Sequence, residues 1–246
     1  MKVISLFDSN LSFSVNNELE EYRVQSLLDK EPETIAWIDS WDKSNSKVFY
    51  DVGSNIGIYS LYAAFRNPKL ETFAFEPERK NYLALIQNIN LNDFHIHPFH
   101  LAISNQTVLT NLFISDLRIG NSGAQINDPI NDAGQYFEPK KVERILASSI
   151  DNLIDSFQMP IPNYVKIDVD GLESNIIDGM RGTLKSEKLE SILIEFNNPD
   201  QYKKHIKEFE NFGFRHNKAI ELIPNHSNVR RSQKLSLARN VIFNRV

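Results

Sequence analysis

Short apolar runs alternate with amphipathic segments along most of the chain, and this alternation constrains the fold more than any other feature. Each apolar run has the length of a buried strand, and each amphipathic segment repeats its apolar residues with the spacing of a helix. Strands that alternate with helices imply a mostly parallel sheet covered by helices on both faces, which is an α/β fold. Strands are predicted over residues 48–50, 72–75, 94–103, 164–167 and 192–194, and helices over residues 58–65, 79–90, 150–157, 173–180 and 200–209.

The N-terminal part of the chain departs from this alternation. Residues 1–45 are predicted to form an N-terminal helical extension, with helix over residues 17–40 that Pro32 divides in two. Such an extension could close over a pocket as a lid. Residues 46–246 are predicted to form the main domain, which carries the ligand site.

Two further segments interrupt the pattern. Residues 109–114 predict an extra strand, and residues 116–140, rich in Gly, Asn, Asp and Pro, predict a long irregular loop. Loops of this length inside compact domains are often functional lids, so Arg118, Asn121, Ser122 and Gln125 are candidate contacts to a substrate. At the C-terminus, residues 214–222 and 239–246 are predicted to pair as a hairpin.

The segment between the first strand and the following helix contains two of the nine glycines, Gly53 and Gly57. Glycine permits positive φ and lets a ligand approach the backbone, and the helix that follows offers free N–H groups. The spacing is not G-x-G-x-x-G, and the Lys of a P-loop is missing. Asp51 opens the turn and would repel a pyrophosphate but attract an ammonium group. The turn therefore favours a nucleoside that bears an amino acid, with a tight turn that binds no ligand as the alternative.

An acidic residue, Glu76, ends the second predicted strand 25 residues after Asp51, and Pro77 follows it. In open parallel sheets the ligand lies beyond the carboxyl ends of the strands, where such an acid can accept hydrogen bonds from both ribose hydroxyls. The alternative is a carboxylate that only stabilises the N-terminus of the next helix.

Five segments of the chain, and a weaker sixth, carry a resemblance to a known family. They are Asp51-Val52-Gly53-Ser54-Asn55-Ile56-Gly57-Ile58-Tyr59-Ser60, Phe75-Glu76-Pro77, Ala102-Ile103-Ser104, Ile150-Asp151-Asn152-Leu153-Ile154, Lys166-Ile167-Asp168-Val169-Asp170-Gly171-Leu172-Glu173 and, more weakly, Ile192-Leu193-Ile194-Glu195. With these segments the chain resembles the FkbM-type family of S-adenosylmethionine-dependent methyltransferases over residues 30–215.

The resemblance implies a class I methyltransferase fold, Rossmann-like, with a seven-stranded sheet whose last strand is antiparallel. It implies S-adenosyl-L-methionine as cofactor and S-adenosyl-L-homocysteine as product, with residues 46–246 as the catalytic domain. The acceptor it implies is a hydroxyl of a sugar, a glycan or a small natural product. Carried over by position, the residues expected to contact the methionine portion are Asp51, Gly53, Asn55 and Gly57. Glu76 is expected to contact the ribose, with Pro77 beside it, and Ala102 and Ile103 are expected to contact the adenine. Asp168 is expected to lie beside the sulfonium or amino group.

The chain departs from the family pattern at two positions. Ser54 stands where the family often has Ala, which is a mild steric change. Asp170 stands where the family usually has Glu, so a carboxylate that faces the acceptor would be one methylene shorter.

Asp168, Asp170 and Glu173 form the densest group of carboxylates. Alternation along an extended segment would place Asp168 and Asp170 on one side, so Asp168 is assigned to the cofactor site and Asp170 or Glu173 to the catalytic base. The alternative is that this segment only caps the following helix. No metal site is predicted, although a divalent cation held by these acids together with Glu195 stays open. His95, His97 and His100 are predicted to be ordinary histidines of the sheet surface.

Composition narrows the partners. The net charge of −5 argues against nucleic acid, since the one basic stretch is Arg230, Arg231, Lys234 and Arg239. The absence of cysteine excludes a thiol nucleophile. No apolar run is long enough for a signal peptide or a bilayer span, so we expect a cytoplasmic protein that does not insert into membranes. The oligomeric state is not predicted.

Two other functions would use part of the same pattern. An NAD-dependent oxidoreductase also needs the strand–turn–helix and the ribose acid, but the missing G-x-G-x-x-G argues against it. A non-catalytic module that keeps the fold and binds cofactor or a partner protein is the other alternative.

Overall fold

The computed structural model describes residues 2–8, 10–131, 134–196, 199–217 and 239–246. Its largest element is a seven-stranded sheet of order β12-β13-β11-β10-β3-β4-β5. The neighbours from β11 to β5 are parallel, and β13 is antiparallel to both β11 and β12. The strands are β3 (Lys47–Val52), β4 (Leu70–Phe75), β5 (Ile96–Phe99), β10 (Tyr164–Ile167), β11 (Ser191–Phe196), β12 (Phe214–His216) and β13 (Arg239–Arg245). This is the class I methyltransferase fold with its antiparallel last strand, as predicted.

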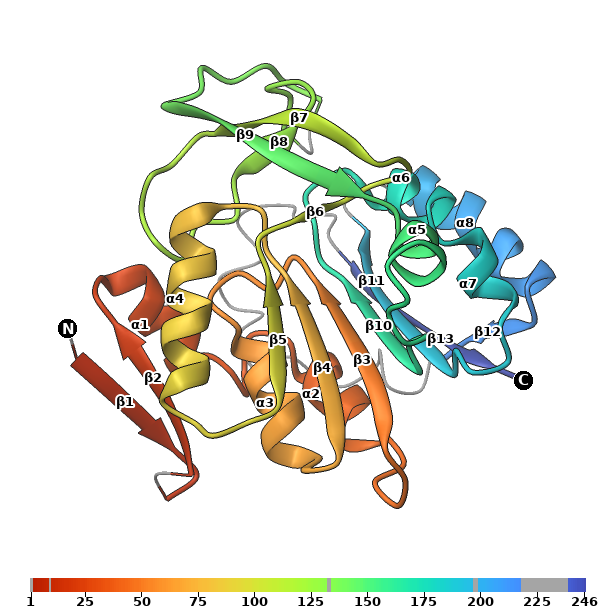
Figure 1. Cartoon of the computed structure of the whole chain (residues 1–246), viewed down its shortest axis with the longest axis horizontal. Helices are drawn as coiled ribbons and strands as arrows, with labels where there is room; N and C mark the ends of the chain where they lie inside the picture. Colours follow the sequence, from red (N-terminus) through yellow and green to blue (C-terminus); the bar gives the residue numbers. More distant parts are fainter. Residues whose placement is uncertain (1, 9, 132–133, 197–198, 218–238) are drawn as a thin grey trace.

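Helices cover both faces of this sheet (Figure 1). Alternate side chains of β3 enter different cores, since Phe49 packs with one cluster of buried residues and Tyr50 with the other. The first core takes side chains from α2 (Pro32–Asp39), α3 (Ile58–Arg66) and α4 (Arg79–Asn90). The second takes side chains from α5 (Ile150–Asp155), α6 (Glu173–Asp178), α7 (Arg181–Lys185) and α8 (Pro199–Asn211).

The N-terminal extension is not helical throughout, which corrects the prediction for residues 1–45. It opens with an antiparallel hairpin, β1 (Lys2–Leu6) and β2 (Leu11–Val15), before α1 (Glu18–Gln25) and α2. Leu11, Phe13 and Val15 are buried in the first core. The alternation of apolar and polar residues in β2 is the period of a strand, and it was the signal for this hairpin. Pro32 does divide the helical part, because it occupies the first turn of α2.

A second sheet of four strands lies over the carboxyl ends of β3, β4 and β5 (Figure 1). Its order is β6-β9-β7-β8, with strands β6 (Ala102–Ile103), β7 (Val108–Ile114), β8 (Ala124–Ile126) and β9 (Lys141–Ser148). The strand predicted over residues 94–103 is therefore two strands in different sheets. The loop predicted over residues 116–140 contains β8, and β9 and α7 were not predicted.

The hairpin predicted at the C-terminus forms, since β12 pairs with β13. Residues 218–222 of the predicted strand lie outside the described residues, as do Arg230, Arg231 and Lys234 of the basic stretch. Among the described residues, no helix combines the length and the apolar character needed to cross a bilayer.

Candidate active site

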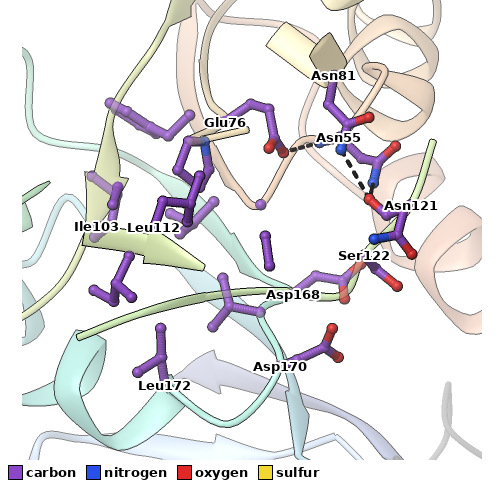
Figure 2. Close-up of a pocket in the computed structure, with 18 of the residues that line it drawn as sticks. Asn55, Glu76, Asn81, Ile103, Leu112, Asn121, Ser122, Asp168, Asp170 and Leu172 are labelled. Atoms are coloured by element: carbon purple, nitrogen blue, oxygen red, sulfur yellow. Dashed lines mark hydrogen bonds between the residues drawn. The ribbon is translucent and has the colours of Figure 1, made fainter. Parts of the chain in front are cut away.

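A pocket of about 210 Å³ lies at the carboxyl ends of β3, β4, β10 and β11, beneath the four-stranded sheet. Figure 2 shows Ile103, Leu112 and Leu172 on one side of it and Asn55, Asn121 and Ser122 on the other. The pocket therefore has an apolar end and a polar end.

The turn after β3 is shaped by backbone that only a few residues tolerate. Gly53 has φ of 81°, and a Cβ there would collide with the carbonyl oxygen of Asp168. Asn55 is also left-handed, with φ of 52°, and both residues line the pocket. Gly57, with φ of 88°, does not line it. It is the N-cap of α3, and a Cβ there would press on Leu61 and Leu85, so this glycine allows α3 to pack against α4.

The carboxyl group of Asp51 lies behind the turn and does not line the pocket. It is buried and accepts a hydrogen bond from the Ser60 hydroxyl. Burial raises the pKa of Asp51, although the neighbouring Lys166 ammonium opposes the rise. The contact of Asp51 with a ligand ammonium stays a prediction, and the hydrogen bond from Ser60 ties this carboxyl group to the first turns of α3.

Glu76 is positioned by two backbone N–H groups. Its Oε2 accepts from the N–H of Asn55 at 2.8 Å and its Oε1 from the N–H of Glu78 at 2.8 Å (Figure 2 draws the first). Each carboxylate oxygen has a second lone pair, so the oriented group can still accept two hydroxyl hydrogen bonds. Burial raises the pKa of Glu76 to about 7.

The apolar end is built around the predicted adenine contacts. Ala102 and Ile103 line it, together with Leu101 and Leu112, and Pro77 lies beside Glu76 in the same wall. Leu101, Leu112 and Leu172 were not predicted, since nothing in the local sequence separates them from ordinary core residues.

Three ionisable side chains, those of Lys166, Asp168 and Glu195, lie next to one another at the polar end. The Lys166 ammonium, fully buried, is bonded to Asp168 at 2.5 Å and lies 4.8 Å from the centre of the Tyr59 ring. Burial alone would raise the pKa of Asp168, but Lys166, the hydrogen bond with Glu195 and the Lys30 charge together outweigh burial and hold that pKa well below its usual range. Burial and the Asp168 anion raise the pKa of Glu195 well above its usual range. The side chains of Glu195 and Asp168 are hydrogen-bonded to each other.

Asp170 and Glu173, the two candidates for the catalytic base, lie in different surroundings. Asp170 lines the pocket, and its backbone carbonyl accepts a hydrogen bond from the Gln125 side chain at 2.6 Å. Glu173 is buried at the start of α6 and does not line the pocket. Its Oε1 accepts from the N–H of Gly171 at 2.9 Å, and burial raises its pKa to about 7. This contact fits the alternative stated for this segment, in which Glu173 stabilises the start of the following helix.

A loop of residues 115–123 closes the polar end. Asn55 and Asn81 both donate from Nδ2 to the carbonyl of Asn121 at 2.9 Å, and the N–H of Gly120 donates to Asn81 Oδ1 at 2.7 Å (Figure 2). Asn121 and Ser122 line the pocket, as predicted for substrate contacts. Arg118 does not, because it is exposed and paired with Asp116.

Two pocket residues come from the N-terminal extension and were not predicted. Arg23 lies in the last turn of α1 and Lys30 between α1 and α2. No local pattern pointed to these two residues, because both belong to segments with the ordinary charge of a helix surface.

Metal-ligand geometry is found elsewhere. Among the described residues, one group of three side chains has ligand atoms close enough together to share a cation. It consists of Glu71, His95 and His97. It lies at the amino ends of β4 and β5, opposite the pocket. The acids of the pocket do not form such a group.

Comparisons with known proteins agree with this geometry. The sequence profile of the methyltransferase FkbM domain matches residues 51–216. A hexuronic acid methyltransferase, AglP of Haloferax volcanii, is 27% identical over 175 residues, which are 71% of this chain and 66% of that protein. The chain thus spans about two thirds of the length of that relative.

Two solved structures with a similar fold are distant from this chain in sequence. The N-terminal domain of human METTL16 in complex with SAH matches with a TM-score of 0.49 and 14% identity, covering 97% of this chain and 76% of that one. A precorrin-6y C5,15-methyltransferase from Geobacter metallireducens matches with a TM-score of 0.46 and 16% identity, covering 94% and 93%. On the extent of the profile match, which includes the glycine turn, Glu76 and the carboxylates after β10, the chain belongs to the FkbM methyltransferase domain family.

Proposed function

We propose that this protein transfers a methyl group from S-adenosyl-L-methionine to a hydroxyl group of a sugar. The observation that carries the proposal is one pocket with the Gly53–Asn55 turn and the oriented Glu76 carboxylate at the ends of adjacent strands. Membership of the FkbM family supports the reaction, and the hexuronic acid methyltransferase among the relatives supports a sugar acceptor.

The residues present fit the cofactor. Glu76 has lone pairs for both ribose hydroxyls, and Ile103 and Leu112 offer an apolar wall for the adenine. The Asp168 anion provides negative charge for the amino or sulfonium group. Gly53 and Asn55 bring backbone close to the methionine portion.

The bound cofactor supplies a methyl group already activated by a sulfonium, so that the acceptor oxygen forms its bond to carbon as the carbon–sulfur bond breaks. The work left to the protein is to align the acceptor and to receive its proton. Alignment of this kind contributes up to about 7–11 kcal/mol to rate enhancement. Asp170 is the carboxylate placed to take the hydroxyl proton, because it lines the pocket and Glu173 does not.

The test of the reaction is a pair of measurements on the purified chain. Calorimetry should show micromolar binding of S-adenosylhomocysteine and no binding of NAD, since an oxidoreductase would bind the second. Labelled methyl from S-adenosylmethionine should then pass to the glycan fraction of a cell extract. Label that resists mild alkali identifies an ether on a hydroxyl, whereas alkali-labile label would show a methyl ester and contradict the proposed acceptor atom.

The role of Asp170 is tested by Asp170→Asn with Glu173→Gln as its matched control. A positioned base contributes about 10²- to 10⁴-fold to the rate, so kcat of Asp170→Asn should fall by a factor in this range while cofactor affinity holds. Glu173→Gln should keep near-wild-type kcat at pH 7. Unchanged turnover in Asp170→Asn would remove this residue as the base, and activity lost in excess chelator would reopen the metal alternative.

A further inference from the structure

The two cations of the pocket, Arg23 and Lys30, come from outside the segment that the family profile matches, which begins at residue 51. The profile match contains the glycine turn and the Glu76 carboxylate, which the proposal assigns to the cofactor, but it does not contain Arg23 or Lys30. Residues that line the pocket from a segment outside the shared domain are therefore placed to recognise the acceptor.

Lys30 is held at the pocket by a buried acid. Its Nζ lies 2.6 Å from Oε1 of Glu31, whose side chain is only 2% exposed, whereas the Lys30 side chain is 34% exposed. Burial alone would lower the pKa of Lys30, but Glu31 and Asp168 outweigh it and raise that pKa above its usual value. Lys30 is therefore a permanent cation that keeps contact with solvent in the pocket.

Arg23 carries the second positive charge. Its Nε–H donates to the backbone carbonyl of Gly120, in the loop that closes the polar end. A carbonyl is neutral, so this bond orients the guanidinium without neutralising its charge. Arg23 lies close enough to Lys30 to oppose the rise in the Lys30 pKa, so the two cations act on the same part of the pocket.

We infer that Lys30, with Arg23 beside it, binds the carboxylate of an acidic sugar, so that the acceptor is a uronic acid and not a neutral sugar. The inference rests on the proposed methyl transfer to a sugar and adds the acceptor class. A guanidinium and an ammonium are the side chains that bind a carboxylate through charge-assisted hydrogen bonds. The nearness of Lys30 to Asp168 places the sugar carboxylate at the polar end, beside the expected position of the sulfonium.

The experiment compares methyl β-D-glucuronide with methyl β-D-glucoside as acceptors for the full chain. The variants are Lys30→Met and Arg23→Met, with Lys69→Met as control, because Lys69 is exposed and bonds only to the backbone of Ser44. The readouts are kcat/KM for each sugar and, separately, the affinity for S-adenosylhomocysteine by calorimetry.

The wild type should prefer the glucuronide. A hydrogen bond to a charged group is worth about 1.5–3 kcal/mol, so Lys30→Met should lose about 10- to 100-fold in kcat/KM on the glucuronide and little on the glucoside. Arg23→Met should lose less, and Lys69→Met nothing. Affinity for S-adenosylhomocysteine should stay within about twofold, since the cations are assigned to the acceptor and not to the cofactor.

Three results would overturn the inference. One is equal use of the two sugars by the wild type, and another is a fall in S-adenosylhomocysteine affinity of Lys30→Met that matches the fall in kcat/KM, which would assign Lys30 to the methionine carboxylate. If neither glycoside is methylated, label transferred to the cell-extract glycans decides: product retained on an anion exchanger supports an acidic acceptor, and wholly neutral product contradicts it. Absence of label in every fraction would instead refute the methyl transfer itself.

Discussion

The floor and the roof of the pocket are built in different ways. The floor consists of the turns that follow β3, β4 and β10, together with Glu195 of β11, and Gly53, Glu76 and Asp168 each lie within a few residues of a buried strand. The roof consists of the loop 115–123 with β8, and side chains far away in the sequence hold it. Asn17, for example, donates to the carbonyl of Ile119 at 3.1 Å and Lys80 to that of Leu117 at 2.7 Å.

The floor and the roof differ in the contacts that must break when each of them moves. The floor cannot shift without disturbing the parallel sheet, because its backbone continues directly from the strands. Each of these roof contacts is a single hydrogen bond, worth about 0.5–1.5 kcal/mol net between neutral groups and about 1.5–3 kcal/mol when the donor is charged, as in Lys80. We therefore expect the floor to be rigid and the roof to open for ligand exchange, and each of the following predictions tests one side of this contrast.

Gly53→Ala should have the largest effect. A Cβ at this position collides with the Asp168 carbonyl, and the backbone has φ of 81°. Strain at such positions costs about 1–3 kcal/mol before the collision is counted, so cofactor affinity should fall by more than about 100-fold. Gly134→Ala is the matched control, because Gly134 has φ of 73° but nothing within 4 Å of its Cβ position. Calorimetry with S-adenosylhomocysteine and a thermal melt of both variants measure this, and equal effects would show that the collision is unimportant.

Glu76→Gln should weaken S-adenosylhomocysteine binding by about 10- to 100-fold, because the amide cannot accept two ribose hydroxyls as the carboxylate can. Glu71→Gln is the control, because Glu71 is a half-buried residue near the start of β4, away from the pocket, and this variant should bind normally.

The pKa of about 7 for Glu76 adds a pH test. The ribose hydroxyls donate to the ionised form, so binding favours loss of the proton and affinity should weaken as pH falls from 8 to 6. The expected slope below the pKa approaches about tenfold per pH unit, and Glu76→Gln should flatten it. A wild-type profile without slope would mean that the carboxylate does not bind the cofactor.

Asn81→Ala should act on the roof alone. It removes the bonds to the Asn121 carbonyl and from the Gly120 N–H. Because two modest hydrogen bonds are lost, dissociation of S-adenosylhomocysteine should accelerate about five- to tenfold. Hydrogen exchange in residues 115–123 should accelerate too, while the amides of β3 and β4 keep their protection. Asn45→Ala, in an exposed turn, is the control. Faster exchange that spreads into β3 would break the distinction between floor and roof.

Glu173→Gln should have the smallest effect on function. Its main effect should be on the pH dependence of the free energy of unfolding. Burial raises the pKa of Glu173 to about 7, above its value in the unfolded chain, so the native state holds this proton more tightly. The stability that the protonated group contributes is complete below the unfolded pKa and is lost as pH rises through 7. The glutamine of the variant does not ionise. The free energy of unfolding of the variant, relative to that of the wild type, should therefore rise by on the order of 2–3 kcal/mol between pH 5 and pH 8. Urea unfolding at the two pH values measures this, and a pH-independent difference would refute it.

The predictions from sequence succeeded where the signal was local. The glycine turn, Glu76 and the order of strands and helices follow from short patterns, because the ends of parallel strands must meet at one edge of a sheet. The four-stranded sheet was missed, since β9 is a mostly exposed strand with no continuous apolar run. The N-terminal hairpin was missed although its alternation was visible, because the acidic helical pattern after it dominated the interpretation of residues 1–45.

The residues of the site also fall into those that a local pattern could place and those that only the packing of distant segments places. Alternation could place Asp168 and Asp170 on one side, but the direction of Glu173 depends on the backbone at Gly171, which has φ of 87° and turns the chain into α6. The cations Arg23 and Lys30 reach the pocket only because β2 of the hairpin packs against both α1 and α4. No local propensity encodes a contact between segments so far apart.

The sequence alone therefore determined the family, the sheet and the two strand ends that line the pocket, since these depend on residues that act within a single strand–turn–helix unit. The tertiary structure decided which acids face the pocket, what closes it and where its positive charge comes from. These depend on packing between distant segments, where a small change in backbone direction moves a side chain from the ligand to the core.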